Sequence, residues 1–132
     1  MLKMRLILAM VLALFAVAGT ASAQETRVSA KILLQESPLA GFQFHEGKQL
    51  WGELRVGDAL QLVREADNPH DVRAVRVEWR GHFLGYVPRA DNEAVARLLD
   101  AGTRLDARIV RLREKRNPWQ RVLFEVYVDS LR

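Results

Sequence analysis

The sequence predicts a small, mostly β protein: an antiparallel β-barrel of about six strands with one α-helix. Three observations support this prediction. Apolar and polar residues alternate through most of the chain, a single segment has the apolar spacing of a helix, and one strand changes the parity of its apolar positions midway. Such a change indicates a β-bulge, and bulges bend strands in the way that a closed or nearly closed barrel requires.

The first two dozen residues have the pattern of an export signal. Lys3 and Arg5 precede an uncharged apolar run, residues 6–18, and the small-x-small sequence of residues 21–23 follows. An apolar run of about 13 residues is shorter than the roughly 20 that a membrane-spanning helix needs, which disfavours an uncleaved anchor. We therefore expect cleavage after Ala23 and a mature domain, residues 24–132, that is periplasmic or secreted.

Strand-like alternation occurs in six places after this signal. The expected strands lie around residues 28–34, 60–62, 75–79, 83–87, 104–115 and 121–129. Arg80 and Gly81 should form a tight turn, and Asn117-Pro118 should break the chain between the last two strands. The parity change predicts a bulge near Ile109.

One helix is expected over residues 91–101. Asp91 is placed to cap its first turn, and Gly102 is placed to end it. Val95, Leu98 and Leu99 form its apolar stripe. The residues expected in the core are Val75, Val77, Trp79, Leu84, Val95, Leu98, Val122, Phe124 and Val126.

Charge is distributed unevenly along the chain. The formal net charge of +4 falls to +2 if Lys3 and Arg5 leave with the signal. Residues 24–102 carry 10 basic and 12 acidic side chains, whereas residues 103–132 carry 8 basic and 4 acidic ones. The basic end is either a solvated strand pair or an anion-binding face.

The polar segment of residues 64–71 joins two expected strands. Pro69 fixes its own φ and favours an extended Asn68, while Asn68 and Asp71 can accept hydrogen bonds from loop amides. A rigid structural loop and a preorganised binding loop are both consistent with this composition.

Three sequence blocks together resemble the HIRAN domain family. They are residues 41–47 (Gly-Phe-Gln-Phe-His-Glu-Gly), residues 64–77 with Asp-Asn-Pro-x-Asp, and residues 81–89 with Leu-Gly-Tyr-x-Pro. The match is best over residues 38–102, and the hairpin of residues 104–129 fits the remainder of the fold. The resemblance implies an OB-like barrel with one helix, in a family that includes parts of helicases and small stand-alone bacterial proteins.

The resemblance also implies a function and a ligand site. Family members attached to helicases bind the free 3′ end of single-stranded DNA through aromatic and basic residues. By position, Phe44 and Tyr86 are aromatic site residues, His70 stands where a Tyr is usual, Asp71 reads the terminal sugar hydroxyl, and Arg89 is the basic residue. The expected function is therefore a non-enzymatic nucleic-acid-binding module.

Two features leave other functions open. Gln43 stands where the DNA-end binders have an Arg, which removes a charge-assisted phosphate contact. Phe44 and Tyr86 would also serve as core aromatics of any β fold. The alternative function is an exported interaction module that binds a protein or a cell-envelope ligand, and a third is a part of a hydrolase system acting on nucleic acid or nucleotides with catalysis supplied elsewhere.

The sequence contains no recognised catalytic or metal-binding pattern. The chain has no Gly-x-Ser-x-Gly, Walker or dinucleotide-binding motif and no cysteine, which argues against an enzyme and excludes thiolate chemistry. His45, His70 and His82 match no zinc spacing, so no metal or other cofactor is expected. Asp67 and Asp71 fit amide acceptors in a loop better than an acid–base pair.

Overall fold

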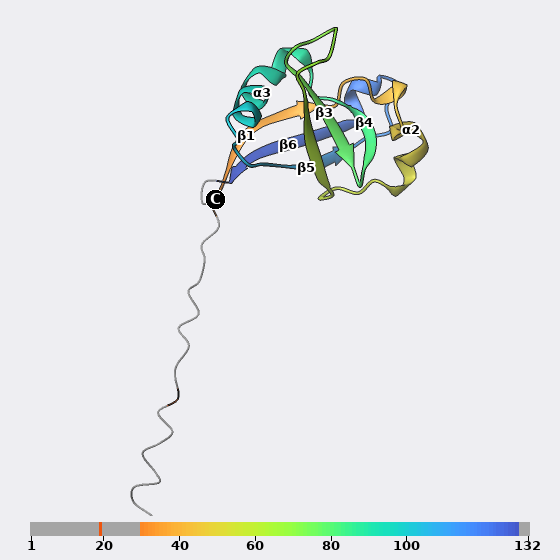
Figure 1. Cartoon of the computed structure of the whole chain (residues 1–132). Coiled ribbons are helices and arrows are strands. Elements are labelled where there is room, and N and C mark those ends of the chain that lie inside the picture. Colours follow the sequence, from red (N-terminus) through yellow and green to blue (C-terminus); the bar gives the residue numbers. More distant parts are fainter. Residues whose placement is uncertain (1–18, 20–29, 130–132) are drawn as a thin grey trace, which may run out of the picture.

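Figure 1 shows the computed structural model of the chain, which describes residue 19 and residues 30–129. The expected export signal, its cleavage point at Ala23 and the start of the first expected strand lie outside the described residues. No helix within the described part of the chain is long and apolar enough to cross a membrane.

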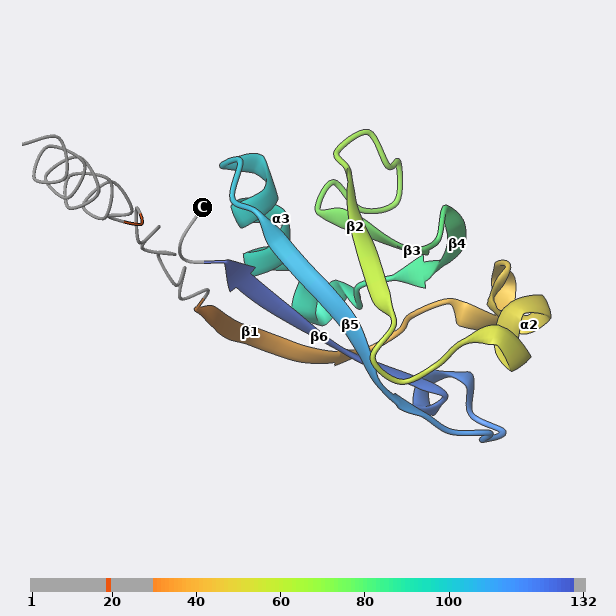
Figure 2. The same cartoon turned by 90° about the horizontal axis from the view of Figure 1, so that it is seen from below.

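Six antiparallel strands form a single curled sheet, as the alternation predicts (Figures 1 and 2). The order across the sheet is β1-β6-β5-β2-β3-β4, so strands from the two ends of the chain lie beside each other. The strands are β1 (Lys31–Pro38), β2 (Ala59–Glu65), β3 (Ala74–Trp79), β4 (His82–Tyr86), β5 (Leu105–Leu112) and β6 (Val122–Asp129). Arg80 and Gly81, both at positive φ, make the expected tight turn between β3 and β4.

The two edges of the sheet meet at one point instead of along a ladder. Ala40, just after β1, and Tyr86 of β4 exchange two backbone hydrogen bonds of 2.9 Å. A Cβ on Gly85 would lie only 2.3 Å from the carbonyl oxygen of Ala40, so glycine is required for this approach. The fold is therefore the expected OB-like, mostly β architecture, but the sheet is not closed.

Bulges produce the curvature. The register of β5 on β6 shifts between Ile109 and Arg111, which confirms the bulge predicted from the parity change. Two further shifts, between Leu33 and Gln35 and between Val77 and Glu78, lie in segments whose sequence gives no such signal. Each shift bends its strand and increases the local twist.

The expected helix is α3 (Asn92–Asp100), which packs against β2 and β3. The prediction that Asp91 caps it with its side chain is wrong, because Asp91 ends the preceding 3₁₀ helix η4 (Arg89–Asp91) and makes no capping hydrogen bond. Gly102 follows the helix end with a φ of 78°, as expected of a helix-ending glycine.

Short helical turns between β1 and β2 escaped prediction. They are η2 (Phe42–Phe44), α2 (Gly47–Leu50) and η3 (Trp51–Glu53). Each is too brief to show an apolar period, although the segment buries Phe42 and Leu54. A fourth turn, η5 (Pro118–Gln120), lies between β5 and β6 and packs against η2.

The core lies inside the curl of the sheet and under α3. Phe124, at 0% exposure, confirms the parity predicted for the last strand. Leu98 is only half-buried, because α3 buries Asn92, Val95 and Ala96, which centres its inner face one turn earlier. The other expected core residues are buried: Val75, Val77, Trp79, Leu84, Val95, Val122, Phe124 and Val126.

Candidate nucleic-acid interface

The loop between β2 and β3 is organised by the side chain of Asn68. Its Oδ1 accepts hydrogen bonds from the backbone N–H groups of His70 (2.9 Å) and Asp71 (3.2 Å). Its Nδ2 donates to Oε1 of Glu65 at 3.1 Å. Asn68 therefore fixes the loop in the way that Asx turns do, while Pro69 and the ring of His70 face solvent.

Asp71 is held in place from two sides. Its Oδ1 accepts from the backbone N–H of Arg73 (3.0 Å), and its Oδ2 accepts from Nδ2 of the buried Asn92 (2.8 Å). Burial opposes ionisation of Asp71, but these hydrogen bonds and the nearby charges of Arg89 and Arg73 outweigh it and lower the pKa of Asp71. The carboxylate is thus ionised and fixed in orientation at neutral pH.

Arg89 contacts both His70 and Asp71. Its Nη2 donates to the backbone carbonyl of His70 at 2.7 Å, and its Nε lies 3.8 Å from Oδ2 of Asp71. The Arg89 side chain is 68% exposed, against 17% for Asp71. The guanidinium is therefore positioned by the loop and still presents donors to solvent.

Tyr86 is connected to the same loop through Glu65. The Tyr86 hydroxyl donates to Oε1 of Glu65 at 2.8 Å, the oxygen that also accepts from Asn68. Arg76 lies 3.7 Å from Oε2 of Glu65 and also pairs with Glu78. Burial and the hydrogen bond to Glu65 raise the pKa of Tyr86, which keeps its hydroxyl protonated.

The rings of Tyr86, Phe83 and His45 form a cluster beside β4, which we call the ring cluster. The Phe83 ring lies 5.2 Å from the Tyr86 ring at nearly a right angle, and the His45 ring lies 3.8 Å from Phe83 with a tilt of 31° and 5.9 Å from Tyr86. The Arg76 guanidinium lies over Phe83, 4.6 Å from the ring centroid. Burial and the charge of Arg76 lower the pKa of His45, so its imidazole is neutral at pH 7.

Phe44 lies close to the ring cluster. Its side chain is 78% exposed, the highest value among the large hydrophobic residues described. It borders a shallow hollow of about 480 Å³ together with His45 and Phe83. An exposed ring of this kind is available to stack on a ligand.

The five site residues predicted from sequence thus fall into three positions. His70, Asp71 and Arg89 contact one another, Tyr86 reaches their loop through Glu65 and Asn68, and Phe44 borders a hollow together with His45 and Phe83. Contacts therefore join four of the five residues, Phe44 shares only a hollow with the ring cluster, and the five do not gather into one pocket.

Four further residues at this surface escaped sequence reasoning. Phe83 and His45 complete the ring cluster, and Glu65 joins that cluster to the loop. Trp119, 47% exposed, stands on η5, which packs against η2. The rings were visible in the sequence only as isolated aromatics, because nothing local indicated which of them would be exposed.

The histidines considered as metal ligands have other contacts. His82 lies 3.2 Å from a carboxylate oxygen of Glu46, His45 stacks on Phe83, and His70 faces solvent on the loop. Over residues 30–129, no three His, Asp or Glu side chains gather in a way that could hold a metal ion.

Fold and surface together define a small OB-like binding module, with stacking rings, a fixed carboxylate and an exposed arginine. The model of the HIRAN domain matches residues 32–130, and the chain belongs to this family. HIRAN domains are nucleic-acid-binding modules, and this family membership sets the ligand class.

Solved structures resemble the chain in fold. A crystal structure of a protein from Lactobacillus plantarum shares 28% identity, with a TM-score of 0.65 over 76% of this chain and 96% of that one. The HIRAN domain of human HLTF shares 16% identity, with a TM-score of 0.59 over 75% of this chain and 79% of that one, which is similarity of fold alone. The search of curated proteins produced no significant match.

Proposed function

We propose that this chain is a non-enzymatic module that binds the free 3′ end of single-stranded DNA. The observation that carries the proposal is the ionised Asp71 carboxylate, fixed beside the exposed Arg89 in a loop that Asn68 and Glu65 join to the ring cluster. A fixed acceptor, a cation and stacking surfaces are the groups that recognise a terminal hydroxyl, a phosphate and unpaired bases.

Asp71 would accept the hydrogen bond of the terminal 3′ hydroxyl. An ionised carboxylate offers about four acceptor positions, of which the hydrogen bonds from Arg73 and Asn92 use two. Because both bonds are already formed in the free protein, little reorganisation is needed when the hydroxyl arrives. A 3′ phosphate in the same place would add negative charge next to the carboxylate and be repelled.

The rings would hold the bases without reading their sequence. Stacking on an aromatic side chain contributes about 1–3 kcal/mol per base. Phe44 is the most exposed of these rings, while Phe83 and Tyr86 are half-buried and contact each other within the ring cluster.

Arg89 would supply the charge-assisted contact to a phosphate near the end. Gln43 provides no second charge where DNA-end binders of the family have an Arg, so affinity at the end should be modest and its salt dependence shallow. Gln43 is also the observation that favours the alternative, an interaction module that kept the fold and binds a protein or cell-envelope ligand.

The export pattern at the N-terminus supports a site of action outside the cytoplasm, where the ligand would be extracellular or imported DNA. Protein isolated from the periplasm or the culture medium is expected to begin at Gln24 when its N-terminus is sequenced. A cytosolic protein that retains Met1 would contradict this localisation and favour a role on chromosomal DNA.

The function is tested by titrating the protein into 5′-labelled single strands that end in a 3′ hydroxyl or a 3′ phosphate. We expect the hydroxyl form to bind about tenfold more tightly, since a hydrogen bond to a charged group contributes about 1.5–3 kcal/mol. Asp71→Asn should abolish this preference, whereas Asp67→Asn, on an exposed carboxylate of the same loop, should keep it. Equal affinity for both ends would refute end recognition, and no binding even at low salt would favour the envelope ligand.

A further inference from the structure

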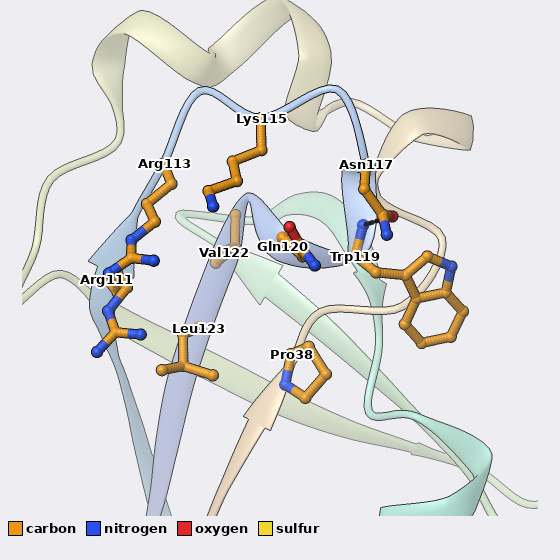
Figure 3. A pocket seen from close by; sticks show the side chains of 9 residues that line it. All are labelled: Pro38, Arg111, Arg113, Lys115, Asn117, Trp119, Gln120, Val122 and Leu123. Carbon is orange, nitrogen blue, oxygen red and sulfur yellow. Dashed lines mark hydrogen bonds between the residues drawn. The ribbon is translucent and has the colours of Figure 1, made fainter.

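The end of the β5–β6 hairpin carries a second polar surface, away from Asp71 and Arg89. Figure 3 shows a groove of about 470 Å³ between the end of β5, the start of β6 and the end of β1. The side chains of Arg111, Arg113 and Lys115 follow one wall of this groove, and Trp119 stands at the opposite side. We refer to this surface as the hairpin groove.

The cations of the hairpin groove have no acidic partners. Among the described residues, no carboxylate lies within ion-pair distance of Arg111, Arg113 or Lys115, whereas Arg64, on β2, pairs with an aspartate at 3.0 Å. Like charges held close together without counter-charges raise the free energy of the folded protein. Their placement along one groove therefore indicates a surface for an anionic ligand.

The spacing of these cations fits a chain of charges better than a single anion. Arg111 lies on β5 and Arg113 directly follows its last residue, so an extended backbone separates them by about 6.8 Å. Lys115 continues the same line into the loop. A linear polyanion can contact all three in turn, which a compact anion cannot do.

The hairpin groove lies next to the segment that carries Phe44. The helix η5, which carries Trp119, packs against η2, which carries Phe44. Trp119 is 47% exposed and borders the groove, so its indole offers a further stacking surface there. A strand that stacks on Phe44 therefore has the hairpin groove on a neighbouring element.

We propose that the hairpin groove binds the backbone phosphates of the single strand upstream of its bound 3′ end. The inference rests on the proposed function, because it takes the same ligand and adds a second contact to it. It also gives a function to three of the eight basic residues in the last part of the sequence, and it supplies phosphate contacts that Gln43 does not provide.

The test compares strands of about 4 and about 12 nucleotides, each with a free 3′ hydroxyl, because this range brackets the site sizes of OB folds. The double variant Arg111→Gln/Arg113→Gln is measured against Arg97→Gln/Arg104→Gln, which removes the same charge from exposed positions elsewhere. Thermal melting of both variants checks that the fold is retained.

For the unmodified protein, we expect the longer strand to bind at least about tenfold more tightly than the shorter one. The Arg111→Gln/Arg113→Gln variant should lose most of this gain, and the slope of log affinity against log salt should fall by about 1.4, or 0.7 for each phosphate contact. The preference for a 3′ hydroxyl should remain, and the Arg97→Gln/Arg104→Gln control should behave like the unmodified protein.

A length gain and salt slope equal to those of the control would overturn the inference and leave end recognition intact. If the hydroxyl preference were absent from the unmodified protein while the length gain still depended on Arg111 and Arg113, end recognition would fail and the hairpin groove would stand as a general phosphate surface. The inference would also be overturned if the Arg111→Gln/Arg113→Gln variant bound phosphatidylglycerol vesicles more weakly than the unmodified protein but bound oligonucleotides equally well. The hairpin groove would then be a membrane-binding surface.

Discussion

Two basic regions of this small domain differ in what their cations contact. On the β2–β4 side, Arg64, Arg76 and Arg89 each face a carboxylate within 4 Å. At the end of the β5–β6 hairpin, Arg111 and Arg113 have no such partner among the described residues. The difference indicates that carboxylates of the protein hold the first set of cations in place, although Arg89 still presents donors to solvent, whereas the second set has no such partner and is free to meet a ligand.

This division matches two separate requirements of nucleic-acid recognition. Exposed ion pairs contribute little to stability, so the pairs of Arg76 and Arg89 matter chiefly because they fix the rings and Asp71 in position. Unpaired cations gain more from a phosphate, since no internal partner has to be given up. The first region would therefore select the end of a strand, and the second would add affinity.

The largest effect is expected in the hydrophobic core, which supports both regions. Phe124 is fully buried in this core, on β6 of the sheet that carries both regions. Phe124→Ala should reduce the free energy of unfolding by about 3–5 kcal/mol, a large part of the total for a domain of this size. Urea unfolding followed by circular dichroism measures it, and a loss below about 1 kcal/mol would mean that the core was assigned wrongly.

Next in size is a change at the contact between the sheet edges. In Gly85→Ala the new Cβ meets the carbonyl oxygen of Ala40, so the bridge from Ala40 to Tyr86 must open. We expect a loss of about 1–3 kcal/mol, as for other overpacked positions. Amide hydrogen exchange should show faster exchange at Ala40 and Tyr86, and unchanged exchange there would contradict the close approach.

A smaller effect distinguishes the two regions directly. Glu65→Gln weakens the hydrogen bonds from Tyr86 and Asn68 and the pairing with Arg76, and should cost about 1–2 kcal/mol. Arg113→Gln, in the hairpin groove, should change stability by no more than about 0.5 kcal/mol. Both are read from the same urea titration, and equal losses would remove the distinction.

The smallest effect is a dependence on pH through His45. Its pKa lies below the ordinary 6.5 because of burial and the charge of Arg76, with Glu65 acting in the opposite direction. The unfolded chain therefore binds this proton more readily, so the contribution of His45 to stability is present above pH 6.5 and is lost as pH falls through the folded pKa. The urea midpoint of unfolding should fall slightly as pH is lowered from 6.5 through the folded pKa of His45. His45→Phe should reduce this dependence of the midpoint on pH.

The sequence was sufficient for the strands, the helix and one bulge, because each depends on local periodicity. The bulge near Ile109 was visible because it changes the parity of a long strand, whereas those after Leu33 and Val77 were not. Side-chain capping by Asp91 was wrong, because a 3₁₀ turn before the helix takes up that residue. Local sequence does not specify such competition between turns.

The site was only partly predictable for a related reason. The family motifs identified the Asp71 loop and Arg89, and the structure joins them by direct contacts. The stacking of His45 on Phe83 arises because η2 and α2 pack against β4. This is a tertiary arrangement, and no periodic pattern in the sequence indicates it. The basic bias of the last strands was evident from composition, but not that its cations would lack partners.

The most direct test of the account is to map oligonucleotide binding by backbone amide chemical shifts in NMR spectra. A strand of about 4 nucleotides with a 3′ hydroxyl should perturb amides of residues 41–46, 68–73 and 83–89, and one of about 12 nucleotides should add those of residues 111–119. Perturbations that begin at the hairpin groove with the short strand, or that never reach Asp71 and Arg89, would contradict the assignment of end recognition to the β2–β4 side.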